Sequence, residues 1–141
     1  MLDLNQDSET MESLLQLKSL ASKDISEAFA MPKNLYTSEK ILEIEENLIF
    51  SNEWLCAGTV SEIPNKGDYL TYEIGKQPIV ITRNFNNEVK AFSNVCLHRM
   101  MPLVKGKGNK KLFTCPYHAW SYSLDGSLKS APYMDRTNCF K

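Results

Sequence analysis

The spacing of apolar residues changes from helical to strand-like near residue 54 of this chain. Between residues 38 and 49, apolar side chains recur about every 3.6 residues, which predicts an amphipathic helix that Thr37 or Ser38 can cap. The residues that define this spacing are Ile41, Ile44, Leu48 and Ile49. Apolar residues between 11 and 20 have a looser helical spacing, so residues 1–33 predict either a docking helix or a solvated tail.

After residue 54, short β-rich runs are separated by turn residues, a pattern typical of an all-β domain. The expected strands cover residues 54–60, 68–74, 77–83 and 88–95. Asn86-Asn87 favours a tight hairpin between the last two strands, and Asp125-Gly126 favours another hairpin further on. The pattern therefore predicts an N-terminal helical segment followed by a β domain.

The composition excludes several classes of protein. A length of 141 residues suits one domain of ordinary size, and a net charge of −1 gives no general drive toward nucleic acid. The sequence has neither an apolar run long enough for a membrane span nor a secretory signal at its start. We therefore expect a soluble, cytoplasmic chain that binds neither nucleic acid nor membrane.

The cysteines fit a reducing compartment better than a disulfide framework, because two of the four lie beside histidines. Cys56 lies in the apolar run WLCAGTV and is expected to be a buried structural thiol. Cys139 has no evident partner motif.

Two short strings carry the clearest chemical signal. CLHRM holds Cys96 and His98, and CPYHAW holds Cys115 and His118, the only two histidines of the chain. Thiolates suit iron–sulfur clusters and zinc, and imidazole suits zinc, copper and iron, so the mixed set leaves iron–sulfur and zinc as candidates. Structural zinc sites usually take two cysteines from one knuckle and two histidines from another, whereas here each string mixes the types. A zinc-stabilised β module that binds other proteins is the minor alternative.

The two strings also resemble a known family. CLHRMMPL followed by FTCPYHAWSYSLDGSLKSAP is similar to the Rieske domain of aromatic-ring-hydroxylating oxygenase large subunits, and the similarity extends upstream to roughly residue 30. The resemblance implies an all-β fold: a Rieske-type antiparallel β sandwich with cluster-binding hairpin loops, preceded by an N-terminal helix. It also implies two parts, a tail or docking helix over residues 1–33 and a Rieske 2Fe-2S domain over residues 34–141.

The resemblance further implies a Rieske 2Fe-2S cluster, in which two cysteines hold one iron and two histidines hold the other. Cys96 and Cys115 would bind the inner iron, and His98 and His118 the outer iron, with the histidines facing solvent. Trp120, together with Tyr117, is expected to shield the cluster.

Several neighbouring positions differ from relatives within the same family. Met100 and Ala119 stand where glycine is more frequent, while Arg99 matches the family's arginine, and we expect the two departures to affect packing rather than ligation. Respiratory-type members carry two further cysteines and a serine that hydrogen-bonds a cluster sulfur. The matching places here hold Met101, Tyr117 and Trp120, so we expect the low end of a Rieske range of roughly −150 to +300 mV.

As function, the resemblance implies one-electron transfer in the N-terminal part of an oxygenase large subunit. The mononuclear iron of that family would lie in a downstream catalytic domain that this chain lacks. The alternative is a free-standing Rieske ferredoxin that carries electrons from a reductase to a separate oxygenase. The implied partners are an electron-donor reductase or ferredoxin, a catalytic oxygenase domain or subunit, and further copies in a homotrimer. The lysine-rich segment 105–111 is a candidate docking edge for an acidic donor.

Overall fold

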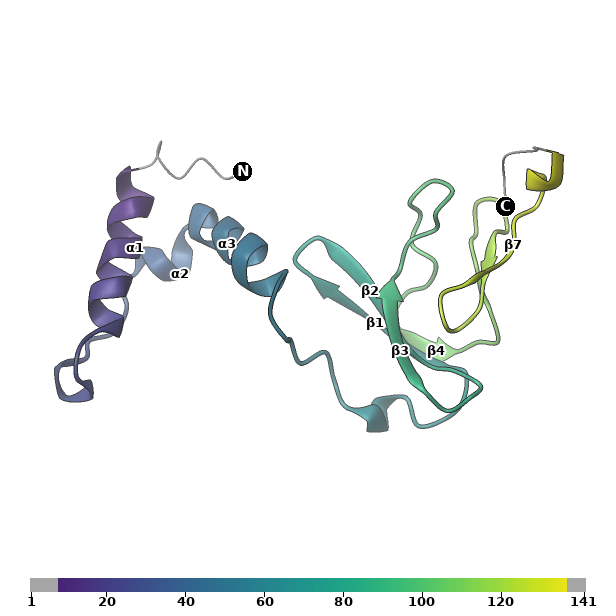
Figure 1. Ribbon diagram of the computed structural model, residues 1–141, viewed down its shortest axis with the longest axis horizontal. Helices are drawn as coiled ribbons and strands as arrows, with labels where there is room; N and C mark the ends of the chain where they lie inside the picture. The colour runs from purple at the N-terminus through teal and green to yellow at the C-terminus, as the bar shows by residue number, and fades with distance from the viewer. Residues whose placement is uncertain (1–7, 137–141) are drawn as a thin grey trace. The chain divides into compact units, whose positions relative to one another are not determined.

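The structure is a computed structural model of the 141-residue chain, and it describes residues 8–136 (Figure 1). The chain divides into two compact units, residues 1–55 and residues 56–141, which are described separately below. The boundary expected between residues 33 and 34 lies inside the first unit. Cys139 lies outside the described residues.

The first unit is helical. Its elements are α1 (Ser8–Ala21), η2 (Ile25–Glu27), α2 (Asn34–Thr37), α3 (Glu39–Glu45) and the π-helical turn η3 (Glu46–Phe50). Ser13 is buried on α1, where its hydroxyl donates to the Glu9 carbonyl at 2.7 Å and accepts a hydrogen bond from the Asn34 side chain of α2. The N-terminal segment is therefore a helix held against α2.

The expected helix after Ser38 is confirmed, with one change near its end. The Ser38 hydroxyl caps α3 by accepting a hydrogen bond from the Ile41 N–H at 3.3 Å. Ile41 and Ile44 are buried, whereas Leu48 and Ile49 are exposed. The π turn explains the difference, because it turns the chain by a smaller angle per residue and so rotates the last two apolar side chains off the buried face.

The second unit is built from two antiparallel sheets (Figure 1). Its strands are β1 (Asp68–Ile74), β2 (Gln77–Arg83), β3 (Val89–Ser93), β4 (Lys107–Asn109), β5 (Phe113–Thr114), β6 (Ser121–Tyr122) and β7 (Leu128–Ser130). The order is β3-β2-β1-β4 in one sheet and β5-β6-β7 in the other. Two single-turn helices complete the unit, η4 (Val60–Glu62) and η5 (Met134–Arg136). The expected antiparallel all-β fold with a preceding helix is confirmed.

One apolar core contains residues from both sheets. Val80 of β2 and Phe113 of β5 are completely buried, and burial of such a side chain contributes about 1.5–3 kcal/mol. The Tyr69 ring of β1 meets the Phe113 ring edge-on, with ring centroids 5.5 Å apart. The buried Thr82 hydroxyl of β2 donates to the Leu124 carbonyl at 2.7 Å. This hydrogen bond ties the larger sheet to the β6–β7 hairpin.

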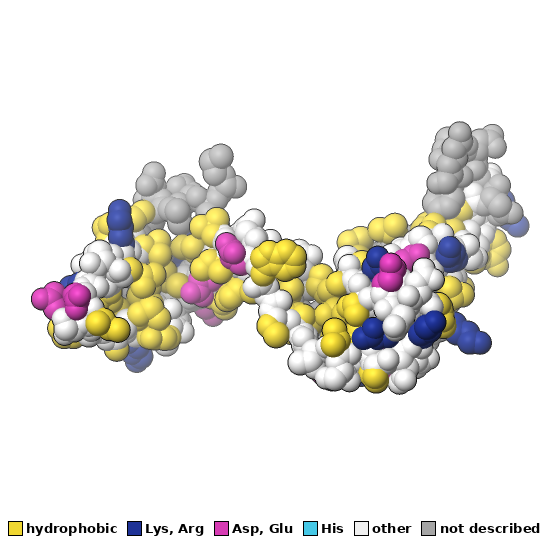
Figure 2. All heavy atoms as spheres, turned by 60° about the horizontal axis from the view of Figure 1, so that its bottom comes forward, with side chains coloured by type: hydrophobic (Ala, Val, Ile, Leu, Met, Phe, Trp, Pro, Cys, Tyr) yellow, Lys and Arg dark blue, Asp and Glu magenta, His cyan; other side chains and the backbone are white. Residues whose placement is uncertain are grey.

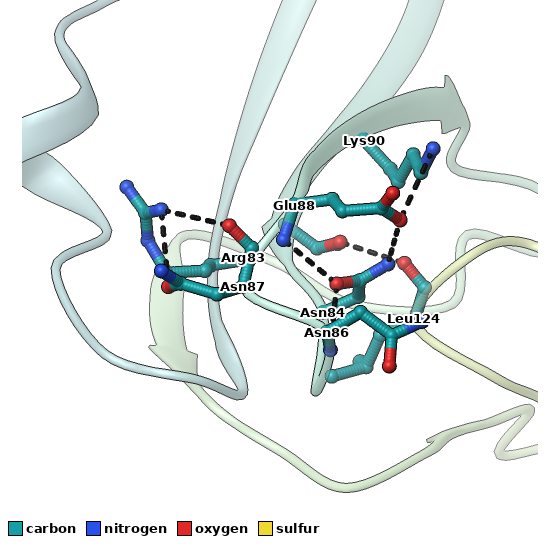
Figure 3. A network of polar contacts seen from close by, with 8 residues as sticks. Arg83, Asn84, Asn86, Asn87, Glu88, Lys90 and Leu124 are labelled. Carbon is teal, nitrogen blue, oxygen red and sulfur yellow. Dashed lines mark hydrogen bonds and ion pairs between the residues drawn. The ribbon is translucent and has the colours of Figure 1, made fainter.

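Both expected hairpins are present. In the β2–β3 turn, the Asn84 side-chain oxygen accepts hydrogen bonds from the Asn86 N–H (3.0 Å) and the Glu88 N–H (2.9 Å), as Figure 3 shows. Asn87 has a φ of 66°, a conformation that asparagine tolerates better than most residues. In the β6–β7 turn, the Asp125 carboxylate likewise accepts hydrogen bonds from a nearby residue of the turn.

The strand expected over residues 54–60 is wrong. In the described part of the chain, this run pairs with none of the strands of either sheet. Glu62 instead accepts a hydrogen bond from the Thr59 N–H at 3.0 Å and turns the chain into η4. Cys56 is exposed, which corrects the expectation of a buried structural thiol.

No helix within residues 8–136 combines the length and the apolar character needed to cross a membrane.

Candidate metal centre

The first cysteine–histidine string forms a closed loop between β3 and β4. Asn94, buried at its base, accepts a hydrogen bond from the Val104 N–H at 3.1 Å and donates to the Val104 carbonyl at 2.8 Å. Inside the loop, the Cys96 N–H donates to the Met101 carbonyl and the Met100 N–H donates to the Cys96 carbonyl, both at 2.8 Å. The cysteine is therefore held by backbone hydrogen bonds on a clamped loop.

The second string repeats this backbone arrangement between β5 and β6. The Cys115 N–H donates to the Trp120 carbonyl at 2.8 Å, and the Ala119 N–H donates to the Cys115 carbonyl at 3.0 Å. In each loop the cysteine thus bonds to the residues four and five positions later. The fourth residues, Met100 and Ala119, both have a φ of 57°.

This left-handed conformation explains why glycine would suit these two positions. A side chain with a Cβ crowds the following carbonyl at positive φ, so glycine is the residue that adopts it without strain. We expected Met100 and Ala119 to affect packing around the loops. The structure adds that both residues hold a left-handed backbone conformation within the loops.

The two loops bring the two histidines together. The ring centroids of His98 and His118 lie 4.6 Å apart, with an angle of 76° between the ring planes. Trp120 of the second loop stacks on His98 of the first loop, with centroids 5.0 Å apart and an interplanar angle of 11°. Trp120 is buried and covers the site as expected. Tyr117 meets the His118 ring edge-on at 5.8 Å but is itself exposed, so it shields less than expected.

The two cysteines lie in the apolar core of the second unit. Cys96 is 1% exposed and Cys115 is 3% exposed. Burial raises the pKa of the Cys96 thiol, but hydrogen bonds from Tyr122, from the His98 and Arg99 N–H groups and from Cys115 outweigh burial and lower that pKa below its usual value. These donors favour a thiolate at Cys96, the form in which cysteine binds metal.

The Tyr122 hydroxyl is placed to donate to this sulfur. It accepts a hydrogen bond from the Leu97 N–H at 3.0 Å and lies 3.4 Å from Cys96 Sγ. Because its oxygen already accepts from Leu97, its proton is free to point at the sulfur. Burial, with the Cys96 contact, raises the pKa of Tyr122 to about 12, so the hydroxyl keeps its proton at neutral pH.

His98 has a buried ring nitrogen that is available to bind a metal. Its Nδ1 atom is buried and has no hydrogen-bond partner among the described residues. Burial, with the nearby His118 and Arg99, lowers the pKa of His98 and so favours the neutral ring that binds metal. An unpaired buried nitrogen is costly in a folded protein, and coordination would satisfy it.

These observations test whether the residues fit a metal group. Among the described residues, no group of three or more His, Cys, Asp or Glu side chains is arranged to hold a metal ion. A structural zinc site requires four ligands around one ion. A two-iron cluster requires two pairs of protein ligands, each on its own iron, and the paired thiols and paired imidazoles fit that requirement.

The comparison with known families agrees with this geometry. The model of the Rieske [2Fe-2S] domain matches residues 53–141. The chain belongs to the Rieske family. The family's cofactor is thus a [2Fe-2S] cluster, and the matched residues include both cysteine–histidine loops.

Among curated proteins, the Rieske chain is similar to oxygenase subunits. It is 46% identical over 110 residues to the glycine betaine monooxygenase oxygenase subunit of Pseudomonas aeruginosa, covering 77% of this chain and 25% of that protein. It is 42% identical over 106 residues to the carnitine monooxygenase oxygenase subunit of Escherichia coli, covering 74% and 28%. With the anthranilate 1,2-dioxygenase large subunit of Acinetobacter baylyi it shares 41% over 101 residues, covering 71% and 21%. The chain thus spans about a quarter of the length of these relatives.

Solved structures show the same relation. The apo form of the quaternary ammonium Rieske monooxygenase CntA matches with a TM-score of 0.75 at 41% identity, covering 81% of this chain and 34% of that chain. Naphthalene 1,2-dioxygenase from Rhodococcus sp. matches with a TM-score of 0.81 at 30% identity, covering 96% and 30%. This Rieske domain is therefore homologous to part of the oxygenase subunits.

Two residues of the site, Tyr122 and Asn94, were not expected from the sequence. A signal for Tyr122 exists, because Trp120, Tyr122 and Leu124 occupy alternate positions along the chain through β6 and all three are buried. That alternation places the tyrosine on the same face as the tryptophan that covers the histidines. Asn94 has no comparable signal, since its partner Val104 lies ten residues away across the loop.

Proposed function

We propose that Cys96, His98, Cys115 and His118 hold the Rieske [2Fe-2S] cluster of this chain, and that the chain transfers single electrons. The observation that carries this proposal is the pair of adjacent imidazoles, together with two buried thiols, on two loops with the same backbone hydrogen bonds. When bound, a Rieske cluster accepts and releases one electron at a time.

Each side chain has a distinct part in the proposal. The cysteines would hold the inner iron, because they are buried and the donors around Cys96 favour its thiolate. The histidines would hold the outer iron. Trp120 fixes the orientation of the His98 ring by stacking on it, and His118 is the exposed member of the pair. Trp120 and Tyr122 also exclude water from the sulfurs, since both side chains are buried.

Anaerobic reconstitution with iron and sulfide tests this assignment. We expect two irons and two sulfides per chain, with the visible and electron paramagnetic resonance spectra of a Rieske centre. Replacing either histidine by alanine should abolish those spectra, whereas Tyr117→Ala, next to His118 but not a ligand, should preserve them. A colourless chain that retains zinc would support the zinc module instead, and a coloured His118→Ala variant would refute the ligand set.

We further propose that the chain acts as the Rieske part of an oxygenase subunit rather than as a free ferredoxin. The support is its 41–46% identity to oxygenase subunits of two substrate classes. Its partners would then be a reductase or ferredoxin that donates electrons and a catalytic oxygenase domain that receives them, in an assembly that we propose is a homotrimer. The mononuclear iron of that domain needs two histidines and a carboxylate. Both histidines of this chain lie in the cluster loops, so other residues must supply that site.

Oxygen consumption and electron uptake separate these roles. The reconstituted chain should accept electrons from a reductase and hydroxylate nothing, because it carries no second pair of histidines. Substrate-dependent oxygen uptake by this chain alone would contradict the proposal. We also propose a cytoplasmic location, since none of the described cysteines, Cys56, Cys96 and Cys115, forms a disulfide, as expected in a reducing compartment.

A further inference from the structure

The larger sheet of the second unit has an apolar face besides the one that meets the core. Leu70 of β1, Ile81 of β2 and Ala91 of β3 lie side by side in the strand register, with Ile81 opposite both of the others. Their neighbours Tyr69 and Val80 belong to the core, and successive side chains of a strand point to opposite faces of a sheet. The row of three therefore lies on the face away from the core.

A hollow of about 260 Å³ lies between this row and the segment 57–63 that precedes β1. The row forms the floor of the hollow, and the segment forms its wall. The hollow exists because several residues around it are small: Ala57 and Gly58 in the wall and Ala91 in the floor carry at most a methyl group. Among the described residues, no charged side chain lines it, and Thr59 supplies its one polar side chain.

Polar contacts fix the segment that forms the wall. Glu62 accepts a hydrogen bond from the Thr59 N–H at 3.0 Å and pairs with Lys107 of β4. Arg83 of β2 donates from its Nε to the Ile63 carbonyl at 2.6 Å. Two strands of the sheet thus hold the segment in place beside the row. The hollow is therefore preformed, as the binding sites of small molecules usually are.

The apolar area around the hollow is too small for a protein partner. Of the residues that line it, only Val60 and Val89 are large hydrophobic residues with much exposed surface, 65% and 44% of the residue. A specific protein interface buries roughly 800 Å² on each partner. On the face visible in Figure 2, the hydrophobic side chains of this unit are interspersed with polar ones and with dark blue Lys and Arg. The hollow thus suits a molecule that enters it rather than a surface that covers it.

We propose that the hollow is a binding site for a small, uncharged, apolar molecule of one or two rings. An apolar cavity of about 150 Å³ engineered in another protein binds benzene, so the larger volume here accommodates a fused pair of rings. A charged molecule is excluded, because burial of a charge without a partner is costly. The lining residues lie outside both cysteine–histidine loops, so the site goes beyond electron transfer and does not depend on it.

Amide NMR of the full reconstituted chain tests binding directly. Coumarin is an uncharged molecule of two fused rings, and coumarin-3-carboxylate is its negatively charged analogue. We expect coumarin to shift the amide signals of Gly58, Thr59 and Ala91 in a saturable way, and the carboxylate to bind about tenfold more weakly or less. Shifts that do not saturate, equal affinity for the two molecules, or saturable shifts confined to residues outside the hollow would overturn the proposal.

A variant that fills the hollow tests its role in binding. Ala91→Leu adds an aliphatic side chain to the floor at a strand position, and it should weaken coumarin binding about tenfold or more. Ala28→Leu adds the same side chain at an exposed position of the first unit and should leave binding unchanged. Full binding by Ala91→Leu, or equal losses in both variants, would contradict the site. Ala57→Val, a smaller addition to the wall, repeats the titration should Ala91→Leu disturb folding.

Sedimentation velocity distinguishes a small molecule from a second copy of the chain as the occupant. We expect Ala91→Leu and the parent chain to have the same oligomeric state. A change of oligomeric state in Ala91→Leu, with no coumarin binding by the parent, would assign the hollow to another copy and overturn the proposal. The visible spectrum and iron content report on the cluster separately, so a colourless chain that binds coumarin would refute the cluster proposal alone.

Discussion

Met100 and Ala119 occupy equivalent positions in two different loops. Each has a φ of 57°, and each donates its N–H to the carbonyl of the cysteine four residues before it. Two segments of unrelated flanking sequence therefore reach the same backbone form around Cys96 and Cys115. Each does so with a residue that the left-handed conformation disfavours.

Glycine at these two positions should stabilise the chain. We expect Met100→Gly and Ala119→Gly each to raise the free energy of unfolding by about 0.5–1 kcal/mol, because relief of left-handed strain exceeds the added entropy of the unfolded chain. Equilibrium unfolding in urea measures the effect. Leu97→Gly is the control, since Leu97 is exposed in the same loop without a positive φ. It should not stabilise, and a gain equal to that of Met100→Gly would refute the strain argument.

The Tyr122 hydroxyl should raise the reduction potential of the centre. Tyr122→Phe keeps the buried ring but removes the hydrogen bond to Cys96 Sγ, and such bonds stabilise the reduced state. We expect the midpoint potential to fall by roughly 40 mV, the one-electron equivalent of about 1 kcal/mol. Protein-film voltammetry gives the value. Tyr69→Phe serves as the comparison, because among the described contacts its hydroxyl makes no hydrogen bond to a thiol, and an equal fall there would argue against a specific effect.

Asn94 should be essential for the first loop. Asn94→Ala leaves the buried N–H and carbonyl of Val104 without partners, so we expect a loss of about 2–4 kcal/mol in the free energy of unfolding. Asn109→Ala also removes two hydrogen bonds, but at an exposed site, and should cost only about 0.5–1 kcal/mol. Urea unfolding of both variants decides the matter. Similar losses would show that burial of the Asn94 contacts is not what makes them strong.

The cysteines should differ sharply in reactivity. Cys56 is exposed and should be alkylated rapidly by iodoacetamide in the native protein, whereas buried Cys96 and Cys115 should react only after metal loss and unfolding. Peptide mapping by mass spectrometry identifies each site. Modification of Cys56 should leave the visible spectrum unchanged, and bleaching upon its modification would place Cys56 in contact with the cluster.

Local signals predicted much of the fold. The helix after Ser38 depends on spacing and a cap that lie within a few residues, and the turns at Asn86-Asn87 and Asp125-Gly126 depend on neighbouring residues alone. The cysteine–histidine strings are likewise local, so their place on loops between strands could be expected. The structure then adds that the two rings meet at 4.6 Å.

Contacts between distant segments could not be predicted in this way. The hydrogen bond between Tyr122 and Leu97 spans 25 residues, and the expected low potential took no account of the Tyr122 hydroxyl beside Cys96. The run 54–60 has strand-forming residues, yet its state depends on whether a neighbouring strand is available for pairing. Leu48 and Ile49 fit a helical stripe, but the π turn at Glu46–Phe50 has no signal in apolar spacing.

The two loops share a backbone but carry their histidines one position apart: His98 follows its cysteine by two residues and His118 by three. Despite the matching backbones, the two histidines have different surroundings. The His98 ring stacks on the Trp120 indole, whereas His118 is exposed to solvent. The centre is therefore exposed to solvent on the His118 side and covered by the buried Trp120 on the His98 side. A molecule that approaches from solvent would contact His118 first. An electron that left the centre on the cysteine side would have to pass through the hydrophobic core.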